Sequence, residues 1–236
     1  MLTATVKKCY NQISKRKSII HLVSGGVIML YEYLVNNYNP GEPIFSADID
    51  IPDVSNNSLR QMLKKLCDQG KIVRYEGGVY YLPLQSSLRG GNALPASVVA
   101  EHKYISRKGR IMGYYSGFTF ANQLGITDQV PYTTEIVTNN AAGKFREISM
   151  KGQKIILRKP KIQVNESNYK VLQLLDLLKD LDKYADEIDS ESISKIVKYI
   201  IDSQMKKESV DKYLAQYPDR IFRTIYETRL YNVLAQ

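Results

Sequence analysis

The chain has 236 residues, of which 44% are hydrophobic, and it carries a formal net charge of +9. This length can hold one large domain or two to three small ones, and the apolar content is enough for a buried core. The cysteines and histidines are few and isolated, which argues against a disulfide framework or a zinc site. They are Cys9, Cys67, His21 and His102. The sequence therefore predicts no metal and no cofactor.

The positive charge is concentrated between residues 83 and 166, where twelve Lys or Arg residues stand against five acidic ones. Residues 167–236 are almost neutral, with eleven basic and twelve acidic residues. A local surplus of this size favours a polyanion or an acidic protein as the partner.

The first 38 residues consist of a basic arm and an apolar run. Lys15, Arg16 and Lys17 precede SIIHLVSGGVIMLYEYLV, an order that resembles a signal peptide. Polar residues and glycines interrupt the run, and no small-residue cleavage site follows it. The run is also too short and too interrupted to span a bilayer. We therefore predict a packing helix over about residues 24–38 and a cytoplasmic protein.

Residues 45–83, FSADIDIPDVSNNSLRQMLKKLCDQGKIVRYEGGVYYLP, carry the clearest pattern in the chain. They predict a short helix over residues 45–49 capped by Ser46, a turn at Pro52, a second helix and a two-stranded hairpin. This order is typical of a winged helix-turn-helix, a module that usually reads double-stranded DNA. Some winged helices bind only proteins, and a generic helix and hairpin with a solvated face is the alternative.

The second predicted helix is strongly two-sided. Ser55 and Asn56 suit its N-terminal cap, and Gly70 suits its end. At 100° per residue one arc is apolar: Leu59, Met62, Leu63, Leu66 and Cys67. The opposite arc carries hydrogen-bond donors and positive charge: Asn57, Ser58, Arg60, Gln61, Lys64 and Lys65. Arg, Asn and Gln can reach base edges in a major groove, and Lys can reach phosphates.

The hairpin after this helix is predicted from KIVRYEGGVYYL, in which Glu76-Gly77-Gly78 forms the turn. Lys71, Arg74 and Tyr75 are expected on or near this wing. The basic N-terminal arm is either a solvated helix face or a second contact to the DNA backbone. The predicted DNA-binding residues are Lys15, Arg16, Lys17, Asn57, Ser58, Arg60, Gln61, Lys64, Lys65, Lys71 and Arg74.

Beyond a linker at residues 84–92, the sequence predicts a helix from Pro95 to about Ser106 and a short helix ended by Gly125. A small antiparallel sheet is then predicted from three segments, TTEIVT, FREISM and KIILRKP. Helical patterns fill the rest, and the last of them is opened by Pro218 and has Phe222, Tyr226, Leu230 and Val233 on one side. The predicted fold class is α+β. Its three parts are a winged helix-turn-helix domain with its arm (1–83), an α+β domain (84–163) and a helical extension (164–236).

No catalytic grouping stands out. Glu101-His102-Lys103 matches the Glu-x-Lys of metal-dependent nucleases by letter, but it falls in a predicted helix and no convincing Asp precedes it. Ser116-Gly117 lacks the leading glycine of a nucleophile elbow. We therefore predict a protein that is not an enzyme.

The middle of the chain carries several short motifs in a fixed order. The first four are G-Y-x-S-G, N-x-L-G, T-x-Q-x-P and a Thr-Asn pair, at Gly113, Tyr114, Ser116, Gly117, Asn122, Leu124, Gly125, Thr127, Gln129, Pro131, Thr138 and Asn139. An N-Y-x-x-L-Q-x-L-D ending follows, at Asn168, Tyr169, Leu172, Gln173, Leu175 and Asp176. With the winged module before them, these motifs resemble the AbiEi-type antitoxins of abortive-infection, type IV toxin–antitoxin systems. Where that family has Leu-Thr-Thr, this chain has Ile126-Thr127-Asp128.

The resemblance implies a repressor that binds inverted repeats in its own operon through the winged domain. It also implies that the following domain counteracts a toxin of the nucleotidyltransferase type. With no transmembrane segment in the sequence, no membrane partner is expected. Residues that could face this partner are Arg107, Lys108, Arg110, Tyr114, Tyr115, Arg146 and Lys151. The motif residues themselves could simply hold the fold. The alternative function is a stand-alone winged-helix transcription regulator whose middle domain senses a ligand through tyrosines such as Tyr114, Tyr115 and Tyr132.

Overall fold

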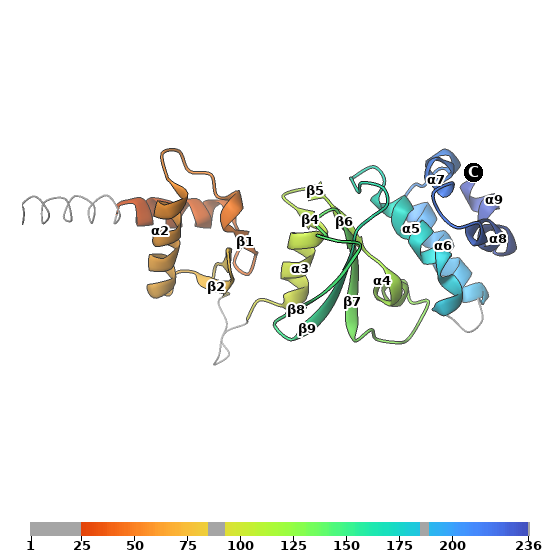
Figure 1. The fold of residues 1–236 in the computed structure, drawn as a ribbon, viewed down its shortest axis with the longest axis horizontal. Coiled ribbons are helices and arrows are strands. Elements are labelled where there is room, and N and C mark those ends of the chain that lie inside the picture. The colour runs from red at the N-terminus through yellow and green to blue at the C-terminus, as the bar shows by residue number, and fades with distance from the viewer. Residues whose placement is uncertain (1–24, 85–92, 185–188, 236) are drawn as a thin grey trace, which may run out of the picture. The chain divides into compact units, whose positions relative to one another are not determined.

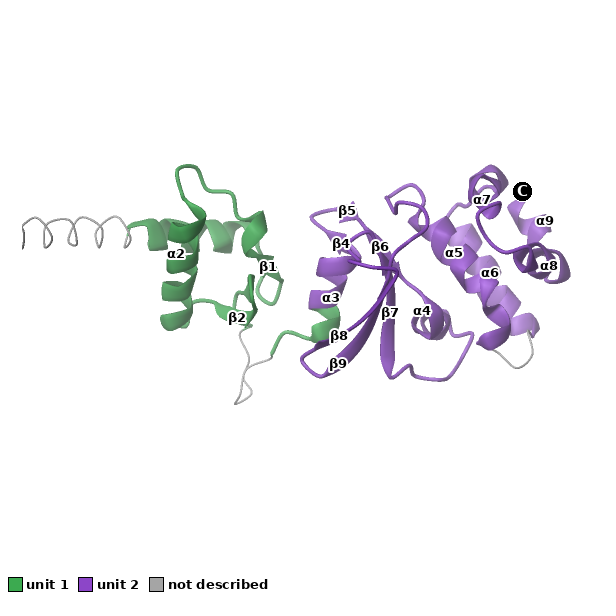
Figure 2. Ribbon diagram, in the orientation of Figure 1, with its two compact units in different colours: residues 1–98 green, residues 99–236 purple. Residues whose placement is uncertain are grey.

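The computed structural model describes residues 25–84, 93–184 and 189–235. Contacts divide the chain into two units, residues 1–98 and 99–236, and the division falls inside α3 (Ala96–Tyr104) (Figures 1 and 2). The parts predicted as 84–163 and 164–236 share a hydrophobic core in the second unit, where Phe120 packs with Leu174 and Leu177.

Unit 1 holds a short helical and β structure whose elements occur in the predicted order. It contains a helix over residues 25–37, β1 (Ile44–Phe45), the 3-10 helix η1 (Ser46–Asp48), α2 (Asn56–Asp68), β2 (Val73–Glu76) and β3 (Val79–Tyr81). The three strands pair antiparallel in the order β1-β3-β2. Leu30 and Leu34 of the first helix are fully buried in one core with Leu63 of α2.

One local prediction in unit 1 is wrong. Ser46 does not cap the short helix, because it is already the first residue of η1 and the cap position belongs to Phe45, which offers no side-chain oxygen. The element is a single 3-10 turn that continues directly from β1. Pairing of Ile44 and Phe45 with β3 fixes the backbone there, so no polar cap is required.

Unit 2 is built around a four-stranded sheet with helices packed against it. Its elements up to the sheet's end are β4 (Ser106–Arg107), β5 (Arg110–Ile111), β6 (Gly113–Tyr115), α4 (Gly117–Gln123), β7 (Thr133–Thr138), β8 (Phe145–Met150) and β9 (Gln153–Arg158). The helical part follows with α5 (Tyr169–Lys179), η2 (Leu181–Lys183), α6 (Ser190–Asp202), α7 (Lys207–Leu214), α8 (Arg220–Glu227) and α9 (Leu230–Leu234). In Figure 1, α4 and α5 lie on one side of the sheet and α6 to α9 lie beyond them. The fold is therefore mixed α+β with a helical C-terminal part, as predicted.

The sheet order is β6-β7-β9-β8, and the sheet is not antiparallel throughout. β6 pairs with β7 and β8 with β9 in antiparallel fashion, whereas β7 and β9 run parallel, with Ile136 opposite Leu157. β7 and β8 are consecutive strands in the chain but do not pair with each other. β9 buries Ile155 and Leu157 and takes the central position, while the more polar β8 becomes an exposed edge.

The last predicted helix is broken in two and is rotated relative to the prediction. Arg229 adopts a left-handed conformation with φ 57° between α8 and α9, which turns the chain back. The buried side chains are Ile221, Ile225, Leu230 and Leu234. Of the predicted face only Leu230 is buried, whereas Phe222 and Tyr226 are exposed and Val233 is partly buried. Phe222 and Tyr226 therefore face outward.

Candidate nucleic-acid interface

Both ends of α2 are fixed by backbone geometry that the sequence predicts. The Ser58 backbone N–H donates to the Ser55 hydroxyl over 3.2 Å and satisfies one of the free donors of the first turn. At the other end Gly70 has φ 68°, and the Lys71 N–H donates to the Leu66 carbonyl over 3.0 Å. This glycine-dependent stop sends the chain directly into the hairpin.

The two arcs of α2 are separated as predicted. Leu59, Met62, Leu63 and Leu66 are buried, and Cys67 is half-buried at the edge of the core. The polar arc is exposed along its whole length: Asn57, Ser58, Arg60, Gln61, Lys64 and Lys65. Within the described part of the chain, Arg60, Lys64 and Lys65 have no ion-pair partner, so their charges face solvent.

Fewer side chains of the hairpin are exposed to solvent than predicted. Arg74 is exposed, and its Nε donates to the Glu76 carbonyl over 3.4 Å. Lys71 is half-buried, with Nζ 4.8 Å from the ring centre of Tyr31. Tyr75 lies on β2 of the hairpin, as predicted, but its side chain is buried: the pairing shifts by one residue between Arg74 and Glu76, and the tyrosine turns inward. Gly78, with φ 78°, closes the turn.

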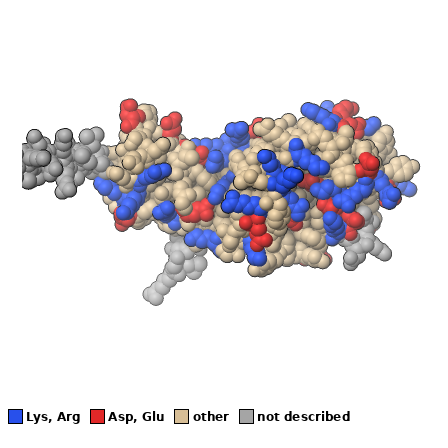
Figure 3. All heavy atoms as spheres, in the orientation of Figure 1, with Lys and Arg blue, Asp and Glu red and all other residues tan. Residues whose placement is uncertain are grey.

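Charge is sharply segregated in unit 1. All five Lys and Arg residues between positions 25 and 84 lie on α2 or on the segment from its end through β2. Of the seven acidic residues in that range, Asp68 and Glu76 belong to these elements, and the others lie elsewhere. In Figure 3, Lys and Arg atoms gather over the part of unit 1 that α2 forms. Such a face suits the phosphates and base edges of a duplex.

The surroundings of the cysteine beside this face disfavour its thiolate form. Burial raises the pKa of the Cys67 thiol, Asp68 raises it further, and Arg74 lowers it only in part. The thiol is therefore protonated at neutral pH, and only the thiolate is a good nucleophile. The predicted arm residues Lys15, Arg16 and Lys17 lie outside the described residues.

The predicted partner-binding residues of unit 2 divide into an exposed group and an internal pair. Arg107, Lys108 and Arg110 belong to the β4–β5 hairpin, which Lys108 turns with φ 51°. Arg146 is exposed on β8, and Lys151 is exposed at the β8–β9 turn. These five side chains are at least partly accessible to a partner.

The tyrosine pair plays a different part. Tyr114 is buried, and its hydroxyl donates to Asp176 Oδ2 over 2.8 Å, so it belongs to the core and not to a partner surface. Burial and the nearby Asp176 carboxylate raise the pKa of Tyr114 far above its ordinary value. Tyr115 is half-buried, and burial followed by the charge of Glu101 raises its pKa to about 12. Tyr132 is 83% exposed, so these tyrosines do not line one ligand cavity.

The side-chain amides of the sequence motifs fix loops and join elements. Asn139 Nδ2 donates to the Val164 carbonyl over 2.8 Å, and the Val164 N–H donates back to Asn139 Oδ1 over 2.9 Å. Gln173 Nε2 donates to the Tyr115 carbonyl, which ties α5 to the end of β6. Asn122 Nδ2 donates to the Thr127 carbonyl. These bonds support a structural role for the motif residues.

Two groups of charged residues were not predicted. Arg158 on β9 bonds Glu135 on β7 over 2.6 Å. Asp180, at the end of α5, is surrounded by Lys179, Lys183 and Arg220. The partners on α8 and β7 are distant in sequence, so no local spacing reveals these contacts. Glu101-His102-Lys103 lies within helix α3, as expected. In the described ranges, no three His, Cys, Asp or Glu side chains are placed to hold a metal ion.

The structure thus defines an α+β protein whose N-terminal unit carries a basic helix and hairpin. The chain belongs to DUF6088, a family of unknown function whose model matches residues 31–210. None of the curated proteins compared with the chain matches it. Among the described helices, none combines the length and the apolar composition needed to cross a bilayer.

Proposed function

We propose that this protein is a DNA-binding antitoxin of the AbiEi type. Unit 1 acts as a winged helix-turn-helix that binds an inverted repeat in the protein's own operon and represses it. Unit 2 counteracts a toxin of the nucleotidyltransferase type. The protein works without a cofactor and performs no catalysis.

One observation carries the proposal. All five Lys and Arg residues between positions 25 and 84 lie on α2 or on the segment that runs from the end of α2 through β2. α2 turns four apolar side chains into the core and six polar ones outward, and the hairpin follows at once. Strand order β1-β3-β2, with α2 inserted between β1 and β2, is the arrangement expected of a winged module. The antitoxin role rests on the motif resemblance, whose residues supply the internal bonds of unit 2.

Replacing Arg60 by alanine is expected to weaken operator binding by about 1–3 kcal/mol, because a bidentate contact to a guanine edge would be lost. Fluorescence anisotropy with a labelled duplex from upstream of the protein's own gene measures the affinity. Arg223→Ala, an exposed arginine of α8, is the matched control and should bind like the unmodified chain. Equal affinity of the two variants would remove Arg60 from the interface.

Replacing Lys64 by alanine is expected to weaken binding to operator and unrelated duplexes alike. A lysine that contacts a phosphate releases a counterion on binding, so its loss should reduce the slope of log affinity against log salt by about 1. Titrations at several NaCl concentrations measure the slope. A loss confined to the operator would instead assign Lys64 to base reading.

The antitoxin role is tested by growth. Expression of the gene next to this one should arrest growth, and co-expression of this chain should restore it. The Arg60→Ala variant should still restore growth, because neutralisation is assigned to unit 2. If the neighbouring gene alone causes no arrest, the antitoxin role is wrong, while DNA binding by unit 1 can still be correct.

A further inference from the structure

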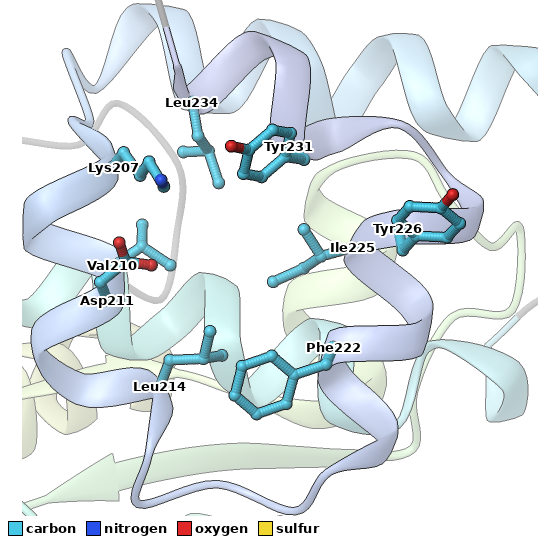
Figure 4. A pocket seen from close by; sticks show the side chains of 9 residues that line it. All are labelled: Lys207, Val210, Asp211, Leu214, Phe222, Ile225, Tyr226, Tyr231 and Leu234. Atoms are coloured by element: carbon cyan, nitrogen blue, oxygen red, sulfur yellow. The ribbon is translucent and has the colours of Figure 1, made fainter.

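The three C-terminal helices enclose a pocket of about 470 Å³. Figure 4 shows α7 on one wall with Lys207, Asp211 and Leu214, and α8 on the facing wall with Phe222 and Tyr226. α9 closes a third side, because the left-handed turn at Arg229 brings it back. The full lining is Lys207, Val210, Asp211, Leu214, Phe222, Ile225, Tyr226, Tyr231 and Leu234. Most of these positions lie beyond the part of the chain that matches the family.

The lining has an aliphatic floor and an aromatic rim. Val210, Leu214, Ile225 and Leu234 are buried and form the floor. The rim is formed by Phe222, Tyr226 and Tyr231, which are 49%, 82% and 50% exposed. Among the described residues, five aromatic side chains are about half exposed or more, and three of these five line this pocket. Leaving apolar rings in water is unfavourable, so an occupant that covers them gains free energy.

The charged groups of the pocket are one cation and one anion on successive turns of α7, beside the hydroxyls of Tyr226 and Tyr231. Lys207 Nζ lies 5.0 Å from the ring centre of Tyr231, and Asp211 follows four residues later. Together they offer a hydrogen-bond donor and an acceptor while adding no net charge. A ligand with a single neutral polar group, such as a hydroxyl or an amide, can use both.

We propose that this pocket binds a neutral, largely apolar small molecule with an aromatic or alicyclic body and one hydrogen-bonding group. Its volume lies within the range of about 300–1,000 Å³ typical of ligand pockets. It is roughly three times the size of a cavity of about 150 Å³ that takes up benzene, so there is room for two or three rings. The site is independent of the proposed DNA and toxin functions.

The test titrates the full chain with Nile red, a neutral fused-ring dye whose fluorescence rises and shifts to the blue in apolar surroundings. We expect saturable binding of one dye per chain. The Phe222→Ala/Tyr231→Ala double variant should bind about tenfold more weakly, since two aromatic contacts are lost. Both side chains are half-exposed, and a thermal melt checks that the variant folds.

The matched control is the Tyr132→Ala/Phe145→Ala double variant, which removes two exposed aromatic side chains outside the pocket. It should bind the dye like the unmodified chain. The proposal is overturned if the dye does not bind, if both double variants bind it equally, or if an anionic naphthalenesulfonate dye binds while Nile red does not. It is also overturned if light scattering shows a dimer that only the Phe222/Tyr231 variant dissociates, because the pocket would then be an interface between copies.

Discussion

Replacing Gly113 by alanine is expected to destabilise unit 2 by about 3 kcal/mol, at the upper end of the cost of overpacking. Gly113 is the first residue of β6 and pairs with Thr138 of β7. A Cβ at this position would collide with the carbonyl oxygens of Tyr104 and Val137. Both obstacles are backbone atoms, so relief requires β6 to move away from α3 or from β7.

Gly143→Ala is the matched control, because a Cβ there meets no atom within 4 Å and its φ is not positive. That change should be neutral or stabilise the protein by up to about 1 kcal/mol through the unfolded state. Hydrogen exchange read by mass spectrometry separates peptides of β6–β9 from those of α2. Faster exchange in the sheet, with α2 unchanged, is expected for Gly113→Ala only. Equal exchange in both variants would contradict the packing argument.

This glycine also explains the start of the G-Y-x-S-G motif in physical terms. Gly113 permits close approach of α3 to the sheet, and Gly117 has φ 60° with no room for a Cβ beside Glu135. Tyr114 between them donates to Asp176, the last residue of the N-Y-x-x-L-Q-x-L-D ending. Two motifs that are 62 residues apart therefore meet in one hydrogen bond. Gly113→Ala should impair any activity of unit 2 and leave DNA binding by unit 1 intact.

The parts of the fold that the sequence predicted well are local. The cap at Ser55, the stop at Gly70 and the two arcs of α2 depend on residues within one or two turns, so helical periodicity was sufficient. Non-local choices were missed. The sequence between β7 and β8 does not show that β9 will pair with β7. That pairing depends on which strand would leave the most apolar surface exposed at the edge of the sheet.

The candidate sites show the same division. The exposed polar arc of α2 could be predicted from the sequence, since all of its residues lie in one helix. In α8, RIFRTIYE contains two stripes at helical spacing, Ile221/Ile225 and Phe222/Tyr226, and only tertiary packing decides which is buried. The sequence suggested the aromatic stripe, and the structure buries the aliphatic one. The exposed aromatic stripe, Phe222 and Tyr226, forms part of the rim of the pocket.

Replacing Asp180 by asparagine is expected to cost about 3 kcal/mol of stability at neutral pH, because it leaves Lys183 and Arg220 without their shared anion and Lys179 with Asp176 alone. Asp180 Oδ1 lies 2.9 Å from Lys183 Nζ and 2.6 Å from Arg220 Nη2, and Oδ2 lies 3.5 Å from Lys179 Nζ. The carboxylate side chain is only 12% exposed, whereas Lys183 and Arg220 are half-exposed. Water partly screens the remaining repulsion, which keeps the expected cost at the low end for a buried pair.

The loss should disappear in acid. Burial alone would raise the pKa of Asp180, but the hydrogen bond from Lys183 and the charges of Lys179, Lys183 and Arg220 outweigh it, so the pKa lies below its ordinary value. A lowered pKa in the folded state means that the carboxylate stabilises the fold above the unfolded value of about 3.9. This contribution is lost as the pH falls through the lower folded value. The gap in stability between Asp180→Asn and the unmodified chain should therefore begin to narrow as the pH falls below about 3.9, and it should close only below the folded pKa of Asp180.

Urea midpoints measured from pH 7 down to pH 3, with hydrogen exchange to separate the two units, follow this convergence. The control is Asp202→Asn, because Asp202 is exposed and pairs with the single exposed Lys198 on α6. A surface pair of that kind contributes at most about 1 kcal/mol, so this variant should differ little at any pH. A gap between Asp180→Asn and the unmodified chain that stayed constant down to pH 3 would mean that shape or hydrogen bonding, and not charge, holds α8 to the end of α5.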